Sequence, residues 1–429
     1  MEYDIAELSQ DERWMQRTLE LARQGIGLTS PNPQVGAVVL DANGQLAGEG
    51  FHTYDGKKHG EVIAVDAAGG RARGGTLYVN LEPCSHEGRT GPCADAVVKA
   101  GIAKVVSAMM DPNIQVRGKG FERLRGAGVQ VLEGVMQKDA RALNAWFAKY
   151  IRTKLPFVTL KAGMTLDGKI APPSQVSMGP TAIGSAAAGS GWITSEEARA
   201  HAQTLRHAND AILVGVGTII ADDPMLTDRS ELPRRKPLLR VILDSQLRLP
   251  LTSRVVASAQ NDVLVLCSMA EEKRRKELEA RGVRVEQVQL AAIPVTRPNS
   301  RKVKQMPVRR RTGTGRPIIE EPRSDGRPDL RHIMRRLGEL EVTSVLIEGG
   351  ALVNWAALAA DVVDKVFLYY APKILAGSGS VPFAAGSGFH QLSEAAQVKD
   401  ISLHRFGIDF AVEGYIHDPY EETNVHRPY

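Results

Sequence analysis

Residues 83–93 read PCSHEGRTGPC, and this stretch holds two of the three cysteines in a chain of 429 residues. Cys84 and Cys93 each follow a proline. Three cysteines do not make a disulfide framework, and the polar N-terminus MEYDIAELSQDERW is not a secretory signal, so we expect a reducing cytoplasm. A disulfide between Cys84 and Cys93 is therefore the weaker interpretation, and a metal site is the stronger one.

The composition is that of an ordinary globular protein, with 43% hydrophobic and 24% charged residues. The length allows two domains, and no apolar run is long enough to span a bilayer. The net charge of +5 favours an anionic ligand without requiring nucleic acid. Much of the positive charge lies in residues 297–317, which we interpret as a solvated loop.

The order of expected elements indicates two α/β domains, at 1–150 and 151–429. In the first, residues 36–51 form a hairpin turning at Asn43-Gly44, and residues 59–70 form a helix. In the second, strands alternate with helices, and Thr194 and Glu197 have the spacing of a capping box. The third cysteine, Cys267, falls in an apolar run and is expected to be buried.

His59 and Glu61 precede the two cysteines and complete a catalytic pattern. His59 with Cys84 and Cys93 supplies three ligands, which leaves a fourth zinc position open for water. Glu61, two residues beyond His59, is the expected proton carrier for that water, as in zinc deaminases. The alternative is a structural zinc site with His52 or His86 as the fourth ligand, but the His-x-Glu pair favours catalysis.

Two glycine-rich sequences follow buried strands in the second half. GVGT (215–218) and EGGA (348–351) each leave backbone amides free for an anion. Neither is the six-residue dinucleotide fingerprint, so the pattern predicts a phosphorylated ligand but not a Rossmann fold.

The motifs together resemble a known family. SPNPQVGAVV, HGE, PCSHEGRTGPC and DPN followed by VRGKG resemble the deaminase half of the bifunctional riboflavin-biosynthesis deaminase/reductases. TLDGKIA, WITSEEAR, LIEGGALVN and YYAPKILAG resemble the reductase half. The resemblance runs from about residue 12 to about residue 415. It implies an N-terminal cytidine-deaminase-like α/β/α domain and a C-terminal dihydrofolate-reductase-like α/β domain.

The resemblance also implies two reactions, one hydrolytic and one reductive. With Zn²⁺, 2,5-diamino-6-(5-phosphoribosylamino)pyrimidin-4-one would lose its 2-amino group. With NADPH, the ribosyl side chain would then become ribityl. Zinc would be held by His59, Cys84 and Cys93, with Glu61 as proton carrier. The pocket for the deaminase substrate would be lined by Asn32, His52, His86, Arg89, Asp111 and Asn113.

Reductase roles follow from the same resemblance. NADPH would contact Met164, Trp192, Thr218, Asp222, Ser245, Gly350, Ala351, Leu352, Val353, Asn354, Trp355 and Ala356. The substrate would contact Ser190, Arg206, Leu226, Arg229 and Glu348, with the arginines on its phosphate. Lys161 and Asp222 are the candidates for proton movement. From the residues alone, Lys161 could equally be a surface strand residue and Trp192 a core residue.

The chain departs from the family pattern in four places. Gly60 replaces the usual alanine of the His-x-Glu motif, and Ile114 follows DPN where a proline is common. Loops at about 172–189 and 297–317 look inserted, which puts the placement of Ser190 in doubt.

Two other functions compete with this assignment. One is a nucleic-acid-editing deaminase that uses the basic segment 297–317, and the other is a structural zinc domain fused to an active reductase. The cysteine spacing and the presence of Glu61 argue against them. We expect a small phosphorylated pyrimidine as the ligand, with no nucleic-acid or membrane partner, and leave open whether the protein is a homo-oligomer.

Overall fold

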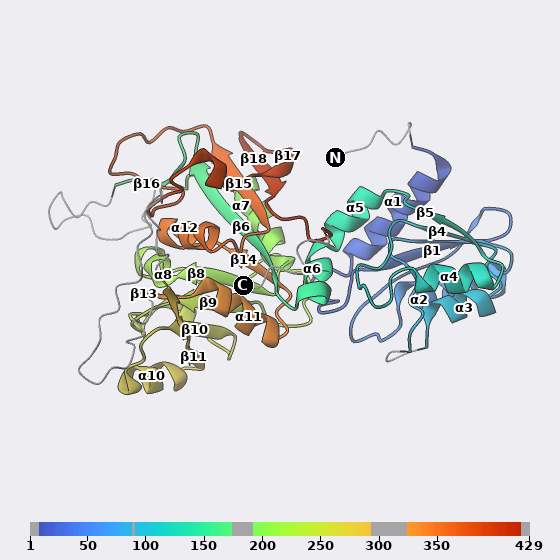
Figure 1. Cartoon of the computed structure of the whole chain (residues 1–429), viewed down its shortest axis with the longest axis horizontal. Coiled ribbons are helices and arrows are strands. Elements are labelled where there is room, and N and C mark those ends of the chain that lie inside the picture. The colour runs from blue at the N-terminus through green and yellow to red at the C-terminus, as the bar shows by residue number, and fades with distance from the viewer. Residues whose placement is uncertain (1–7, 88–90, 174–191, 293–323, 422–429) are drawn as a thin grey trace, which may run out of the picture.

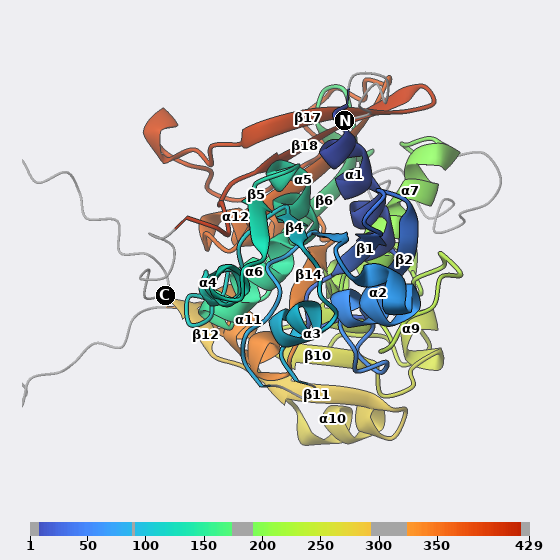
Figure 2. The ribbon, with the colours of Figure 1, turned by 90° about the vertical axis from the view of Figure 1, so that its right-hand side faces the viewer.

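The computed structural model describes residues 8–87, 91–173, 192–292 and 324–421. The chain forms two units that lie side by side, the N-terminal one smaller (Figure 1). Figure 2 looks along the line that joins them, with the N-terminal unit in front. Among the described residues, no helix is long and apolar enough to cross a membrane.

The N-terminal unit is built on a five-stranded sheet with the order β2-β1-β3-β4-β5. Strand β1 is antiparallel to β2 and β3, and β3, β4 and β5 are parallel. Helices α2, α3 and α4 lie along one face and α1 and α5 along the other (Figure 1), which is the predicted α/β/α arrangement. The strands are β1 (Gly36–Leu40), β2 (Leu46–Phe51), β3 (Thr76–Val79), β4 (Lys104–Ser107) and β5 (Gln130–Glu133). The helices are α1 (Gln10–Arg23), α2 (Gly60–Ala68), α3 (Cys93–Lys99), α4 (Lys119–Gly126) and α5 (Gln137–Leu143).

Glycines in the β1–β2 hairpin let helices approach both of its faces. A Cβ on Gly36 would lie 2.2 Å from the Thr18 carbonyl oxygen of α1. A Cβ on Gly48 would lie 2.2 Å from the Ala64 carbonyl oxygen of α2. The predicted turn is also present, since Gly44 has a φ of +76°, a conformation that glycine adopts without strain.

The C-terminal unit is built on a nine-stranded sheet with the order β11-β10-β9-β8-β14-β6-β15-β18-β17. The strands from β11 to β15 in this order are parallel, and β18 and β17 continue the sheet antiparallel. The strands are β6 (Phe157–Thr165), β8 (Ala211–Gly215), β9 (Leu239–Leu243), β10 (Val263–Cys267), β11 (Val283–Gln287), β14 (Ser344–Ile347), β15 (Lys365–Ala371), β17 (Lys399–Phe406) and β18 (Asp409–Tyr415). Two short pairs stand apart: β7 (Lys169–Ala171) with β16 (Val381–Pro382), and β12 (Leu290–Ala292) with β13 (Ser324–Pro328).

Helices cover both faces of this sheet because its strands alternate their side chains between two hydrophobic clusters. In β8, Leu213 joins the cluster beneath α11 and α12, whereas Ile212 and Val214 join the cluster beneath α8, α9 and α10. The helices are α7 (Glu196–His207), α8 (Val216–Asp222), α9 (Arg254–Ala257), α10 (Glu272–Glu279), α11 (Leu330–Glu339) and α12 (Ala351–Ala359). Cys267 is fully buried at the end of β10, as the sequence predicts.

The two units are joined through helix α6 (Ala145–Thr153), which runs across the predicted boundary at residue 150. The helix ends at Lys154 in a left-handed conformation, and β6 begins at Phe157. The predicted cap of α7 is wrong by one residue, because Ser195 rather than Thr194 accepts a hydrogen bond from the Ala198 amide. Segment 297–317 and residues 174–189 of the other predicted insertion lie outside the described residues.

Candidate active sites

The three predicted metal ligands come together at the ends of three elements. The ligand atoms of His59, Cys84 and Cys93 lie within 4.8 Å of one another. His59 Nδ1 is 3.2 Å from Cys93 Sγ and 3.6 Å from Cys84 Sγ. His59 is the residue before α2, Cys93 is the first residue of α3, and Cys84 follows β3. One imidazole and two sulfurs at this spacing fit a tetrahedral zinc ion with one position left over.

The surroundings favour a thiolate at Cys84. Its sulfur accepts hydrogen bonds from Cys93, including one of 3.3 Å from the backbone amide at the start of α3. Hydrogen bonding from Cys93 outweighs partial burial and lowers the pKa of the Cys84 thiol to about 4. A thiolate is the form of cysteine that binds metal, so the local chemistry suits zinc before any ion is bound.

Glu61 is placed for proton transfer rather than for binding the metal. It lies in the first turn of α2, its side chain is buried, and Oε2 has no hydrogen-bond partner among the described residues. Burial raises the pKa of Glu61 to about 7, against the opposing effect of His59. A buried carboxylate oxygen without a partner beside three zinc ligands fits a group that bonds to a water on the metal.

Asn32 and His52 form the wall next to the metal ligands. The His52 ring is buried and lies edge-on to the His59 ring, with centroids 5.1 Å apart. Its Nδ1 donates to the Lys58 carbonyl oxygen at 2.9 Å, so Nε2 is left to accept from the Asn32 amide at 3.2 Å. The bond between Asn32 and His52, and the bond from His52 to Lys58, therefore hold both residues at the predicted pocket.

Asp111 and Asn113 lie on a loop that is held by a residue the sequence reasoning missed. Glu82 is buried, and its carboxylate accepts from the backbone amides of Asp111, Gly118 and Gly120 at 2.8–3.0 Å. The sequence shows only that it directly precedes Pro83-Cys84, which does not identify its partners. Burial raises the pKa of Asp111 to about 7. Glu82 thus ties the loop to the strand end that carries a zinc ligand.

The remaining residues predicted for this pocket are not brought to the metal by described contacts. His86 is exposed, and Arg89 lies outside the described residues. Their proposed contacts with substrate stay predictions.

In the C-terminal unit the two glycine-rich sequences lie side by side, because β8 and β14 are neighbours in the sheet. A Cβ on Gly215 would lie 2.9 Å from Val353 Cγ2, and a Cβ on Gly350 would lie 3.6 Å from Thr218 Oγ1. Within the part of the chain that the structure describes, no side chain caps the N-terminus of α8 or of α12. The carboxyl ends of these parallel strands therefore present free amides, where α/β sheets bind phosphates.

Glu348 stands at the end of β14 between two cations. Arg206 Nε and Nη2 bond its two oxygens at 2.8 and 3.0 Å, and Lys161 Nζ is 3.5 Å away. Burial alone would raise the pKa of Glu348, but Lys161 and Arg206 outweigh it and lower the pKa to about 2. Lys161 also lies over the Tyr369 ring, so it is a partly buried strand residue that faces the site and not a surface lysine.

The predicted cofactor residues divide into two groups. Thr218, Ser245, Gly350, Leu352 and Val353 are at least partly accessible at the carboxyl edge of the sheet. Of the others, Asp222 is exposed and Ala356 is partly accessible. The rest are buried, packed on other residues or exposed away from that edge. Asn354 is buried and donates to the Phe383 carbonyl oxygen, and Trp355 packs on Phe389 and Gly386. Met164 and Ala351 are buried. Trp192 is 70% exposed with Arg199 stacked on its ring, so it is not a core residue.

The predicted substrate residues are also placed unequally. Arg206 is paired with Glu348, and Arg229 is exposed. The Leu226 side chain packs in the hydrophobic core with a backbone φ of +57°, so only its backbone is left to meet a ligand. Asp222 ends α8 and is exposed, and Ser190 lies outside the described residues.

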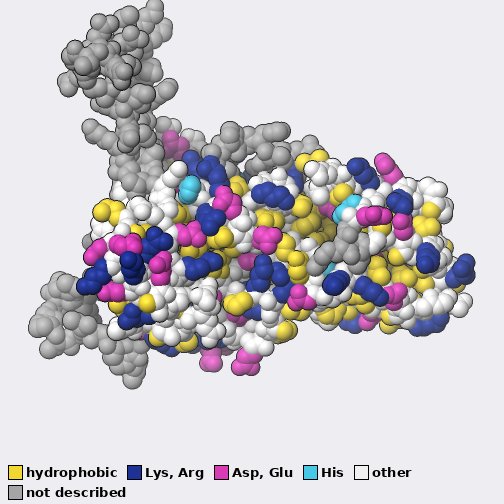
Figure 3. Space-filling view, turned by 90° about the horizontal axis from the view of Figure 1, so that it is seen from below, with side chains coloured by type: hydrophobic (Ala, Val, Ile, Leu, Met, Phe, Trp, Pro, Cys, Tyr) yellow, Lys and Arg dark blue, Asp and Glu magenta, His cyan; other side chains and the backbone are white. Residues whose placement is uncertain are grey.

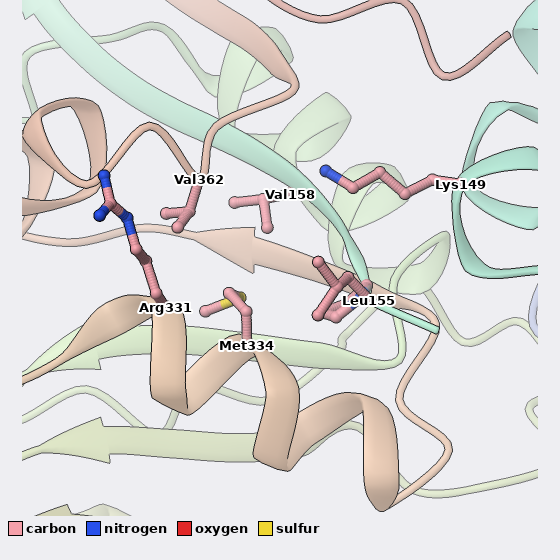
Figure 4. A pocket seen from close by; sticks show the side chains of 7 residues that line it. Lys149, Leu155, Val158, Arg331, Met334 and Val362 are labelled. Atoms are coloured by element: carbon pink, nitrogen blue, oxygen red, sulfur yellow. The ribbon is translucent and has the colours of Figure 1, made fainter. Parts of the chain in front are cut away.

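A separate small pocket lies where α6 meets the C-terminal unit (Figure 4). It is lined mainly by apolar side chains, and Lys149 pairs with buried Asp364 beside it. The lining residues are Lys149, Leu155, Pro156, Val158, Arg331, Met334 and Val362. None of them was predicted for either site.

Two family models match the chain in the order of its units. The cytidine and deoxycytidylate deaminase zinc-binding region matches residues 8–109, and the RibD C-terminal domain matches residues 156–412. The matched ranges contain the zinc cluster and the Glu348 site respectively.

Curated relatives and solved structures match almost the whole chain. The riboflavin biosynthesis protein RibD of Actinobacillus pleuropneumoniae is 36% identical, over 95% of this chain and 96% of that protein. RibD of Escherichia coli is 38% identical, over 93% and 98%. The structure of Acinetobacter baumannii RibD has a TM-score of 0.73 at 33% identity, over 95% of this chain and 98% of that one. A diaminohydroxyphosphoribosylaminopyrimidine deaminase/5-amino-6-(5-phosphoribosylamino)uracil reductase from Thermotoga maritima has a TM-score of 0.70 at 32% identity, over 94% and 98%.

These matches confirm the family, fold class and pair of cofactors that the sequence predicts. The chain belongs to the RibD family, the bifunctional deaminase/reductases of riboflavin biosynthesis, which carry a zinc-binding deaminase domain and an NADPH-dependent reductase domain.

Proposed function

We propose that the two residue clusters divide the two reactions between them, with the hydrolase activity at His59, Cys84, Cys93 and Glu61. The substrate is 2,5-diamino-6-(5-phosphoribosylamino)pyrimidin-4-one, and water replaces its 2-amino group, which leaves as ammonia. Zinc, when bound, supplies a water whose pKa is low enough to give a nucleophile at neutral pH. The buried Oε2 atom of Glu61, which lacks a described partner, supports this assignment most directly.

In this proposal Glu61 takes the proton from the attacking water and passes it to the departing amine. Its burial supports the role, because a carboxyl group whose pKa lies near 7 can both accept and release a proton at neutral pH. Asn32 and His52 orient the pyrimidine beside the metal. Asp111 and Asn113 also contact the pyrimidine, from the loop that Glu82 holds.

We propose the oxidoreductase activity at the carboxyl edge of the nine-stranded sheet. NADPH, when bound, would supply the hydride that reduces C1′ of the opened ribosyl group, and the attached nitrogen would gain a proton to give 5-amino-6-(5-phosphoribitylamino)uracil. The amides at Gly215 and Gly350 hold cofactor phosphate. Lys161 is favoured over the exposed Asp222 as the proton donor, because its ammonium points at the buried Glu348 carboxylate.

In this proposal Glu348 positions Arg206 and also contacts the substrate. It fixes Arg206 through two hydrogen bonds, and Arg206 Nη1 also donates to the Thr227 carbonyl oxygen at 2.9 Å. A guanidinium held in this way keeps fewer donors for a phosphate than that of the exposed Arg229. We therefore assign the substrate phosphate chiefly to Arg229.

The partner is a phosphorylated pyrimidine, and the free cysteine ligands suit a reducing cytoplasm. An RNA-editing role is less well supported. On the face shown in Figure 3, Lys and Arg side chains are interspersed with Asp and Glu rather than gathered into a stripe.

The test is incubation of the purified protein with the diamino substrate, with and without NADPH, followed by mass analysis. We expect the deaminated ribosyl product without NADPH and the ribityl product with it. Unchanged substrate in both reactions would refute the proposal.

A further inference from the structure

The C-terminal unit contacts α5 through Arg141 and Asp418, and it also contacts residues 25–32, the segment that leads into the deaminase site. His207, the last residue of α7, places Nε2 3.3 Å from the Ile26 carbonyl oxygen. Gly27 lies directly against it, since a Cβ there would be 2.8 Å from His207 Cε1. A side chain at residue 27 would therefore separate the two surfaces.

Arg235 makes the densest set of these contacts. Its guanidinium donates from Nη2 to the Ser30 carbonyl oxygen at 2.6 Å, and its backbone amide donates to the Gly27 carbonyl oxygen at 2.9 Å. The guanidinium carbon also lies 4.0 Å from the centroid of the Tyr54 ring. Arg235 of the reductase domain thus bonds to this segment at two points and stacks on Tyr54.

Asp210 fixes the hydroxyl group of Ser30. Its Oδ2 accepts from Ser30 Oγ at 2.8 Å and from the Thr343 amide and hydroxyl at 2.8 and 2.6 Å. Thr343 is buried and directly precedes β14, so Ser30 is tied to the centre of the reductase sheet.

Two residues further on, the segment reaches the deaminase pocket. Asn32 bonds His52, and the His52 ring lies against the ring of the zinc ligand His59. Beyond this point the N-terminal part of the chain holds its own backbone, because Asn144 bonds both the amide and the carbonyl of Gln34. The part before Asn32, by contrast, is bonded by His207, Asp210 and Arg235 of the other unit.

We infer that Arg235, a residue of the reductase domain, is a positioning residue for deamination, because it sets the Ser30–Asn32 backbone that places Asn32 at the pyrimidine. This inference rests on the proposed deaminase function. It makes the first reaction dependent on the second domain without any contact between Arg235 and the zinc ligands.

The experiment measures ammonia release from the diamino substrate by the full chain in the absence of NADPH. In Arg235→Ala, we expect kcat/KM to fall about tenfold (about 1.4 kcal/mol), mainly through KM, because the Ser30 carbonyl oxygen loses a charged hydrogen-bond donor. Zinc content should stay within about twofold of that of the parent protein. The rate of NADPH oxidation on the separately supplied deaminated intermediate should also stay within about twofold of the parent rate. Arg235→Lys keeps a cation over Tyr54 and a donor for Ser30, so it should recover part of the loss.

Lys236→Ala is the matched control, because Lys236 is the neighbouring residue, is exposed and pairs only loosely with exposed Glu341 at 3.8 Å. It should leave both reactions unchanged. If Arg235→Ala does not fold, Ser30→Ala removes the hydroxyl bond to Asp210 and should raise KM for deamination in the same direction.

Failure of the parent protein to release ammonia would count against the proposed function itself. If the parent is active, deamination unaltered in Arg235→Ala, or an equal loss of both reactions, would overturn the inference.

Discussion

Replacing Glu348 by glutamine tests the charge arrangement of the reductase site. The side chain keeps its size but loses the negative charge that holds Lys161 and Arg206, whose side chains are only 18% and 12% exposed. Two cations at such positions without a counter-charge are costly. We expect a less stable reductase domain and a large loss of NADPH oxidation.

The magnitude follows from the pKa of Glu348. A fall from the ordinary 4.5 to about 2 corresponds to about 3 kcal/mol in favour of the ionised folded state. Because the folded pKa is the lower one, this stabilisation is fully present above about pH 4.5 and is lost as the pH falls toward about 2. Glu348→Gln should therefore lower the free energy of unfolding by about 3 kcal/mol at pH 7 and remove that part of the acid dependence.

Urea unfolding followed by circular dichroism measures this difference, with ammonia release reporting separately on the N-terminal domain. Glu341→Gln is the control, since its pair with Lys236 is exposed and contributes little. A Glu348→Gln protein that unfolds at the same urea concentration as the parent would show that the cations do not depend on Glu348, and the reasoning would fail.

Three further changes separate the parts of the account. Asp222→Ala should slow reduction by about tenfold or more through loss of its predicted contact with NADPH, while ammonia release stays normal; unchanged NADPH oxidation would remove Asp222 from the site. Glu82→Gln should lower the free energy of unfolding by about 2 kcal/mol and weaken deamination, because several backbone amides lose a charged acceptor; thermal unfolding and ammonia release check this, and a parent-like result would contradict the loop assignment. Removal of zinc with a chelator should abolish ammonia release and spare NADPH oxidation on the deaminated intermediate; loss of both would mean that zinc supports the whole fold.

The zinc cluster could be predicted from the sequence because its determinants are local. His59 and Glu61 are fixed by the first turn of one helix, and Cys84 and Cys93 lie at either end of one short connection. Helix α2 packs on α3, so His59 and the two cysteines come close together once the sheet has formed. The alternating pattern of strands and helices likewise indicated both α/β domains.

The role of Glu82 could not be predicted in the same way. Its partners lie about thirty to forty residues further along the chain and are backbone amides, which carry no sequence signal. The same holds for Arg235, whose target is a carbonyl oxygen in the other domain.

The predicted cofactor run at 350–356 shows a further limit of sequence reasoning. Its residues were predicted to contact NADPH as one set, but α12 turns Asn354 toward Phe383 and packs Trp355 against Phe389. A helix presents only part of its circumference to a ligand, and which part depends on a later loop of the chain. The contacts of residues 350–356 with NADPH stay a prediction, and Leu352 is the exposed member of the run.

The central claim is that one chain holds two chemically separate sites, and Glu61→Gln tests it most directly. The variant keeps the three zinc ligands but removes the carboxylate that transfers the proton, which is worth about 10²–10⁴-fold in rate. Ammonia release and NADPH oxidation on the deaminated intermediate should be measured on the same preparation, together with its zinc content. The account predicts that ammonia release is lost while zinc and NADPH oxidation remain at parent levels. Equal ammonia release from the variant and the parent would contradict it.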